Sequence, residues 1–346
     1  RAPSISELFA ATTTTTGQLV VDPCQLALPV SNAALRAICL AQGAPTSQIG
    51  SINPPAAGSV NVTSGGNPNL GVEHAKTWTL GVVLQPRIVP NLTLTLDYYS
   101  IKITDAITAP TIGDAVDACF GAINPGLALT AACAAIRRNP LTGQLSGPVS
   151  NTAGLPLQLS NLGVIETDGV DLSVNYRHDL GFGRLDLAFN GNWTNSSKFQ
   201  ATPTSVEREC VGYYSTNCNA FGFSATTNGS IQPKISWNQR TTLTVGRFDA
   251  SLLWRYIDAV KYEPLGSTAV LPQFARIKAA NYFDLTGRAT VRENLVLTLG
   301  VQNLFDRQPP IVGANAGPAS FNAGNTYPST YDVLGRRFAM TASVKF

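Results

Sequence analysis

The carboxy-terminal residues of the chain alternate between apolar and polar side chains. From Phe338 to Phe346 every even-numbered residue is apolar, and the residues between them are mostly polar. Successive side chains of a β-strand point to opposite faces, so this segment predicts a strand with one apolar and one polar face. A soluble sheet can contain such a strand. Here, however, segments of roughly ten residues repeat the pattern along most of the chain, which is typical of a transmembrane β-barrel.

Nine segments after residue 70 follow this alternation, whereas the first 70 residues are expected to be irregular. The predicted strands are residues 73–85, 91–103, 158–178, 184–195, 234–245, 248–257, 281–291, 295–305 and 338–346. The fold class that we expect is therefore all-β, a transmembrane antiparallel up-and-down β-barrel. One long connection, residues 104–150, is expected to contain a short helix at about residues 127–138.

The lengths of the connections predict how the barrel is oriented. In outer-membrane barrels the short turns are periplasmic and the long loops are extracellular. The connections near Pro86, Gly181, Gly246 and Glu293 are short, so we expect them and the carboxy terminus to lie in the periplasm. An odd number of strands does not suit a complete bacterial barrel. We therefore expect residues 1–346 to form one domain that is the carboxy-terminal part of a larger barrel.

The composition agrees with a wall between lipid and water. Charged residues make up 13% of the chain, about half the usual share of a soluble domain, and much of the polarity comes from Gly, Thr, Asn and Ser. The formal net charge of +3 and the lack of a basic run argue against nucleic-acid binding. No segment approaches the roughly 20 apolar residues of a membrane-spanning helix.

Six cysteines form three close pairs in the sequence. The pairs are Cys24 with Cys39, Cys119 with Cys133, and Cys210 with Cys218. Each pair lies within one polar connection, which predicts local disulfides formed in an oxidising compartment. None of the pairs has Cys-x-x-Cys spacing and the chain has 2 histidines, so we expect no zinc site and no cofactor.

Five short motifs resemble those of TonB-dependent outer-membrane receptors. They are RAPS at residues 1–4 with ELF at 7–9, NPNL at 67–70 with Glu73, TDGVD at 167–171, NLFD at 303–306, and the terminal aromatic Phe346. They follow the family's order and span essentially the whole chain. One departure is Gly71-Val72, where the family usually has a basic residue and a proline before the glutamate.

The resemblance implies a 22-stranded barrel, of which these roughly nine strands are the last part. The plug domain, the TonB box and the earlier strands would lie outside this sequence. The implied function is TonB-coupled, energised uptake of a scarce, bulky solute such as a ferric siderophore across the outer membrane of a Gram-negative bacterium. The implied partners are outer-membrane lipid, the extracellular solute, the TonB complex, and the barrel assembly machinery, for which Phe346 would be the assembly signal.

Two other functions remain open at this point. A passive porin would lack the plug domain, and a surface adhesin or phage-docking barrel would bind without uptake. An enzyme is not expected, because catalysis needs a nucleophile, a base and an orienting group close together. The two histidines, His74 and His178, are predicted on opposite sides of the membrane, and the chain has no Gly-x-Ser-x-Gly elbow.

Candidate solute contacts lie on the polar face of the strands and in the loops. The polar face carries Asp171, Arg177, Asp186, Asn190, Arg240, Arg255, Asp284 and Arg288. Of these, Arg177, Arg240, Arg255 and Arg288 are candidate contacts, although such charges can instead pair across strands or with the plug. Loop aromatics are the other candidates, because loops carry binding. They are Tyr213, Tyr214, Phe221 and Phe223.

A further set of aromatics falls near the ends of the predicted strands. These are Trp78, Tyr98, Tyr176, Trp193, Trp237, Trp254 and Tyr256. Amphipathic rings favour the boundary between lipid and headgroups, so we expect these residues to form the aromatic girdles of the barrel rather than a solute site.

Overall fold

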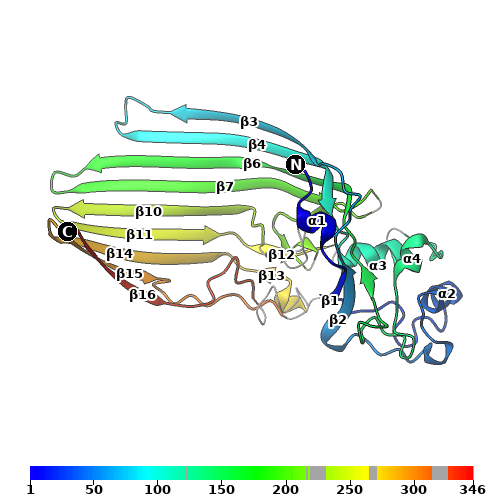
Figure 1. Cartoon of the computed structure of the whole chain (residues 1–346). Helices are drawn as coiled ribbons and strands as arrows, with labels where there is room; N and C mark the ends of the chain where they lie inside the picture. The colour runs from blue at the N-terminus through cyan, green and yellow to red at the C-terminus, as the bar shows by residue number, and fades with distance from the viewer. Residues whose placement is uncertain are drawn as a thin grey trace.

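The computed structural model of the protein describes residues 1–121, 124–203, 205–215, 217–218, 231–264, 271–313 and 326–345. Long strands lie side by side in one curved sheet, and helices and short strands gather at one end of it (Figure 1). The sheet order is β16-β15-β14-β11-β10-β7-β6-β4-β3, with β8 beside β7, and its long strands are all antiparallel. Neighbours in this sheet follow one another along the chain, which makes it an up-and-down meander.

All nine predicted strands are present. They are β3 (His74–Leu84), β4 (Leu92–Thr108), β6 (Ser160–Asp179), β7 (Arg184–Gln200), β10 (Ile235–Val245), β11 (Phe248–Ile257), β14 (Ala280–Arg292), β15 (Leu295–Gln302) and β16 (Arg337–Val344). The ends of β4 and β7 differ most from the prediction, because both strands continue pairing with β6 through bulges beyond the apolar segment. The short β8 (Arg208–Glu209) pairs with this extension of β7.

The two faces of the sheet differ in polarity, as the alternation predicted. On one face apolar residues stand opposite one another from strand to strand, as do Leu96 with Leu172 and Leu299 with Met340. Many of these side chains are exposed in the described part of the chain; Trp78, for example, is 77% exposed. A continuous apolar face of this size suits lipid. We call this the outer face, and the opposite, polar face the inner face.

Short turns join the long strands at one end of the sheet. Gly181 and Gly246 adopt positive φ angles there, which glycine allows without strain. The chain returns to this end after β16, where the backbone N–H of Lys345 donates to the carbonyl of Asn294 in one of the turns. The long connections all lie at the opposite end (Figure 1).

The first 70 residues are not irregular, which corrects the sequence expectation. They contain α1 (Ile5–Phe9), β1 (Thr13–Gln18), α2 (Ala33–Ala41), β2 (Ser59–Ser64) and the 3₁₀ turns Thr46–Gln48 and Ala56–Gly58. The connection between β4 and β6 adds α3 (Ile112–Phe120), α4 (Ala131–Ala135) and β5 (Leu155–Pro156). The predicted helix at about 127–138 is thus only one turn long, and α3 was not predicted. Strands β1, β2 and β5 form a small sheet.

A second small sheet lies at the ends of β10, β11 and β14 that are opposite the short turns. It consists of β9 (Tyr213–Tyr214), β12 (Val260–Tyr262) and β13 (Arg276–Ile277), which follows the 3₁₀ turn Pro272–Phe274. The helices of the described chain are all too short or too polar to cross a membrane.

The apolar cores are also at this end. Leu19, Ile38, Val62 and Ile136 belong to one cluster with α3 and α4, and Tyr214, Tyr282, Tyr327 and Tyr331 belong to another. Together these elements form a folded loop assembly at the predicted extracellular end.

Candidate functional site

Three of the four candidate arginines on the inner face are paired with aspartates of the same wall. Arg177 donates to Asp186 at 2.8 Å. Arg255 lies 3.2 Å from Asp284, and Arg288 lies 3.5 Å from Asp249. Each pair joins neighbouring strands, so these charges stabilise the wall and are largely neutralised by it.

Arg240 differs from the other three. Its guanidinium donates to the Ser251 hydroxyl at 3.0 Å, and it has no carboxylate partner among the residues that the structure describes. It lines an open hollow of about 340 Å³ on the inner face, near the turn end. Asn175, Arg177, Asp186 and Thr242 also line this hollow. Since a guanidinium carries five N–H donors, Arg240 keeps most of them for another molecule.

The loop aromatics have different surroundings. Tyr213 is half-buried, whereas Tyr214 is fully buried in the tyrosine cluster. The ring of Tyr214 packs edge-on against Tyr262 and Tyr327, with centroids 5.5 and 6.1 Å apart. A solute could therefore reach Tyr214 only after this cluster opens. Phe221 and Phe223 lie outside the described residues.

Two hydroxyls in this tyrosine cluster make no hydrogen bond. They belong to Tyr214 and Tyr331, and neither has a partner in the described chain. Burial raises the pKa of the Tyr214 phenol to about 12 and raises that of Tyr331 as well. An unpaired buried hydroxyl costs free energy, so the closed cluster is less stable than an apolar one of the same shape. No local sequence signal pointed to this cluster, because it joins residues that lie far apart in the chain.

Arg208 connects three different loops inside the loop assembly. Its guanidinium lies 2.7 Å from Glu263, 3.2 Å from Asp114 and 3.8 Å from Asp117. Arg208, Glu263 and Asp114 are almost completely buried. Burial raises the pKa of Asp117; Arg208 opposes this shift, and the charges of Asp114 and Glu263 add to it. The network therefore holds α3, β8 and the segment after β12 together.

Glu263 receives further hydrogen bonds from the loop that contains a disulfide. The Ser215 hydroxyl donates to it at 2.6 Å and the Asn217 amide at 3.3 Å. Both residues lie between Cys210 and Cys218, which form a disulfide. The buried carboxylate of Glu263 thus holds both this small loop and the Arg208 side chain in place.

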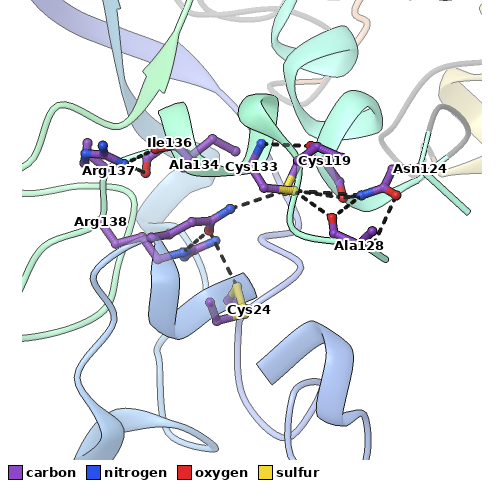
Figure 2. Close-up of a disulfide and its surroundings, with 12 residues drawn as sticks. Cys24, Cys119, Asn124, Ala128, Cys133, Ala134, Ile136, Arg137 and Arg138 are labelled. Atoms are coloured by element: carbon purple, nitrogen blue, oxygen red, sulfur yellow. Dashed lines mark hydrogen bonds between the residues drawn. A yellow bond between two sulfur atoms is a disulfide. The ribbon is translucent and has the colours of Figure 1, made fainter. Parts of the chain in front are cut away.

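The other two disulfides cross-link the part of the loop assembly that contains α2, α3 and α4. Cys24 is bonded to Cys39 and Cys119 to Cys133, as the sequence predicted. Figure 2 shows Asn124 and Ala128 beside the second disulfide, where the Asn124 amide donates to the Cys119 and Ala128 carbonyls.

A buried ion pair links the two disulfide-bonded segments. Arg138 binds Asp22 with two hydrogen bonds of 2.6 and 2.8 Å and donates to the Gln42 side chain at 2.7 Å. Both charged side chains are at most 1% exposed. Residues 22 and 138 belong to different loops, so this pair fixes the first segment of the chain against the β4–β6 connection.

Ion pairs join the first two of the five motifs, at residues 1–9 and 67–73. Arg1 binds Glu7 at 2.8 Å and Glu73 at 2.7 Å, and Glu73 also accepts from the backbone N–H of Ile107. Glu7 in turn closes a capping box with Ser4 at the start of α1. Burial acts to raise the pKa of Glu7, but hydrogen bonds from Arg1 and Ser4 outweigh it and leave the pKa below its usual value. The spacing Ser-x-x-Glu was a signal for this helix start.

The strand-end aromatics lie on the outer face. Trp237, Trp254 and Tyr256 contact one another, with the Trp237 ring centroid 4.3 and 5.4 Å from the other two. Trp254 stands directly opposite Phe283, and the Trp237 ring lies against that of Phe189. This is the placement expected of an aromatic girdle.

Groups for metal binding are not gathered in the described chain. No three His, Cys, Asp or Glu side chains there could hold a metal ion together. His74 contacts Asp105 at 3.1 Å at the loop end, whereas His178 contacts Tyr176 at 3.2 Å near the turn end.

Comparison with known proteins gives one family. A family model described as "TonB dependent receptor-like, beta-barrel" matches residues 1–304. A search of curated proteins found no match.

Several solved structures are similar to this chain. One is a mutant of the ferric enterobactin receptor PfeA from Pseudomonas aeruginosa, with a TM-score of 0.50, 16% identity, and coverage of 83% of this chain and 33% of that one. Another is the siderophore receptor PirA from Acinetobacter baumannii, with a TM-score of 0.47, 14% identity, and coverage of 83% and 34%. The chain thus spans about a third of the length of these structures. At such identities, the first similarity supports the fold alone.

Proposed function

The chain belongs to the TonB-dependent receptor-like β-barrel family, and we propose that it works in an outer-membrane receptor for energised, TonB-coupled uptake of a scarce, bulky solute. The family match over residues 1–304 carries this proposal. The apolar outer face, the polar inner face and the loop assembly at one end support it, because such a receptor needs a lipid contact, a water-filled path and an extracellular capture surface. This family consists of receptors in the outer membrane of Gram-negative bacteria, and we propose no catalytic activity.

We propose a ferric siderophore as the solute. The solved structures named above are receptors for ferric enterobactin and for a siderophore, which makes this solute class the first to test. Arg240 supports the proposal, since its guanidinium has no carboxylate partner among the described residues and so suits an anionic chelate passing along the inner face. The expected partners are the solute, the TonB complex, the barrel assembly machinery and outer-membrane lipid.

The test is solute uptake by cells that produce the full-length protein in a strain lacking it. The panel contains ferric siderophores of several chemical types, cobalamin and oligosaccharides, each labelled. We expect uptake of one ferric siderophore and of no oligosaccharide. Uptake of none of these solutes, with the protein present in the outer membrane, would contradict the proposed function.

Arg240→Ala tests the inner-face contact within the same assay. We expect it to weaken uptake of an anionic chelate about ten-fold or more, since charge-assisted hydrogen bonds are each worth roughly 1.5–3 kcal/mol. Arg292→Ala is the matched control, because Arg292 is an exposed cation at the turn end outside the hollow. Equal loss in both variants would count against a specific role for Arg240.

The two alternatives give different results in these assays. A porin would admit small solutes without preference, and an adhesin or phage-docking barrel would bind cells or phage through its loops without uptake.

A further inference from the structure

Two of the three carboxyl groups around Arg208 are well supplied with hydrogen-bond donors. Asp114 accepts from the backbone N–H and the hydroxyl of Thr111, at 3.0 and 2.9 Å, in addition to its ion pair with Arg208. Glu263 accepts from Arg208 at 2.7 Å and from two side chains of the small disulfide loop. These donors stabilise the negative charge of both carboxylates.

Asp117 is the third carboxyl group, and it has much less support. It lies 3.8 Å from the Arg208 guanidinium and accepts no hydrogen bond from the residues that the structure describes. Its side chain is 24% exposed. It belongs to the last turn of α3, at the negative end of the helix dipole. The helix therefore disfavours a negative charge at this position, and so does partial burial.

The charges around Asp117 are unbalanced. The charged side chains that face it are Asp114 from its own helix, Arg208 from β8, and Glu263 from the segment after β12. One guanidinium thus already serves two carboxylates, and a third negative charge would be repelled by both in a site with little water to screen it. Burial is the main cause that raises the pKa of Asp117; Arg208 opposes the shift, and the other two carboxylates add to it.

We propose that Asp117 is a pH-sensitive switch in the loop assembly: its neutral form lets α3 pack tightly against β8 and the segment after β12, and its ionisation loosens these contacts. Helix α3 lies among the long connections, at the end of the sheet opposite the short turns (Figure 1). The pH of the external medium would therefore act on the switch directly. This link to the medium rests on the location in the proposed function, whereas the switch itself does not.

The sign of the effect follows from linkage between protonation and folding. An aspartate in an unfolded chain loses its proton near about pH 4, whereas Asp117 in the closed network keeps its proton to a higher pH. Between these two pKa values the stability of the closed network falls as the pH rises, and above them it stays lower. Acid therefore tightens this part of the loop assembly, up to the point where Asp114 and Glu263 also take up protons.

The test is hydrogen exchange of the purified full-length protein, from about pH 4, the usual pKa of aspartate, to about pH 8. Protection factors are corrected for the direct effect of pH on the exchange chemistry. Asp117→Asn is neutral at every pH. We expect its α3 amides to be protected as in the unaltered protein at the acid end, and about two- to five-fold better at the alkaline end, the size expected for relief of like-charge contacts. Other carboxyl groups titrate in both proteins, so the difference between the two isolates Asp117.

The matched control is Glu293→Gln, which removes an exposed carboxylate at the turn end of the sheet. Its α3 amides should be protected like those of the unaltered protein at every pH. Equal protection of Asp117→Asn and the unaltered protein across the series would overturn the proposal. Weaker protection of Asp117→Asn at the alkaline end would also overturn it, because the ion pair with Arg208 would then outweigh the repulsion. No solute is present in this experiment, so its failure is distinguishable from failure of the proposed function.

Discussion

At the scale of single residues, the loop assembly depends on buried charges that are shared between loops. Arg208 lies among Asp114, Asp117 and Glu263, and Arg138 lies against Asp22. The net stabilisation by such buried pairs is small, because removing both charges from water is costly. Removing only one partner lowers stability strongly, because the remaining charge stays buried without a partner. These residues therefore make the assembly of the loops specific and vulnerable to single substitutions.

Arg208→Ala tests this vulnerability. We expect it to lower the unfolding free energy of the loop assembly by about 3–5 kcal/mol, because it leaves three carboxylates around an empty position. The measurement is hydrogen exchange of the α3 and β8 segments, which should lose protection while β10 and β11 keep it. Lys198→Ala is the control, since it breaks an exposed pair with Glu207 that water screens, so it should change stability little. Equal effects of the two changes would show that the Arg208 network does not hold the loops.

Glu7 predicts a pH dependence for the docking of the first segment. Its pKa is held below the usual value, so its contribution to stability is complete above about pH 4.5 and is lost as the pH falls through the lowered pKa. We expect Glu7→Gln to lower the melting temperature of the segment at neutral pH. The difference from the unaltered protein should vanish in acid, where Glu7 is protonated in both states. A difference that persists unchanged in acid would mean that the charge of Glu7 is not the cause.

At the scale of the elements, each long strand contributes one residue in two to lipid and the other to the inner face. The register of β4 with β3 and β6 fixes this division, because a slip by one residue would exchange the faces. The consequence is that neighbouring residues on one strand should tolerate a charge very differently.

Leu96→Arg and Thr95→Arg make this comparison on β4. Leu96 faces outward opposite Leu172, and Thr95 faces inward opposite Ser173. We expect Leu96→Arg to lower the stability of the folded barrel by about 2–4 kcal/mol if the position lies near the bilayer centre, and Thr95→Arg to have little effect. Unfolding in urea from lipid vesicles gives both values. A larger effect at position 95 would reverse the assignment of the faces.

At the scale of the whole molecule, the sheet could be predicted from the sequence but the loop assembly could not. Strands, turns and faces depend on local alternation, and each disulfide joins cysteines at most 15 residues apart, so both signals are visible in short windows. The capping boxes at Ser4 and Thr111 are equally local patterns, but the helices α1 and α3 that they begin were not predicted.

The missed features depend on contacts between distant residues. Asp22 and Arg138 are 116 residues apart, and Arg208 and Glu263 are 55 apart. Composition gave no reason to pair these charges rather than others. The burial of Tyr214 likewise follows from how three loops fold together over the start of β14. Residues next to Tyr214 in the sequence could therefore not show that it is buried.

We propose that this wall belongs to a receptor whose transport is driven by energy from the inner membrane. The test is the uptake rate of whichever solute the uptake panel identifies. It is measured in cells that produce the full-length protein, with and without a proton motive force. We predict that binding of the solute to the cells persists when the proton motive force is dissipated, whereas its uptake stops. Uptake that continues at the same rate in de-energised cells would contradict the claim and indicate a passive porin.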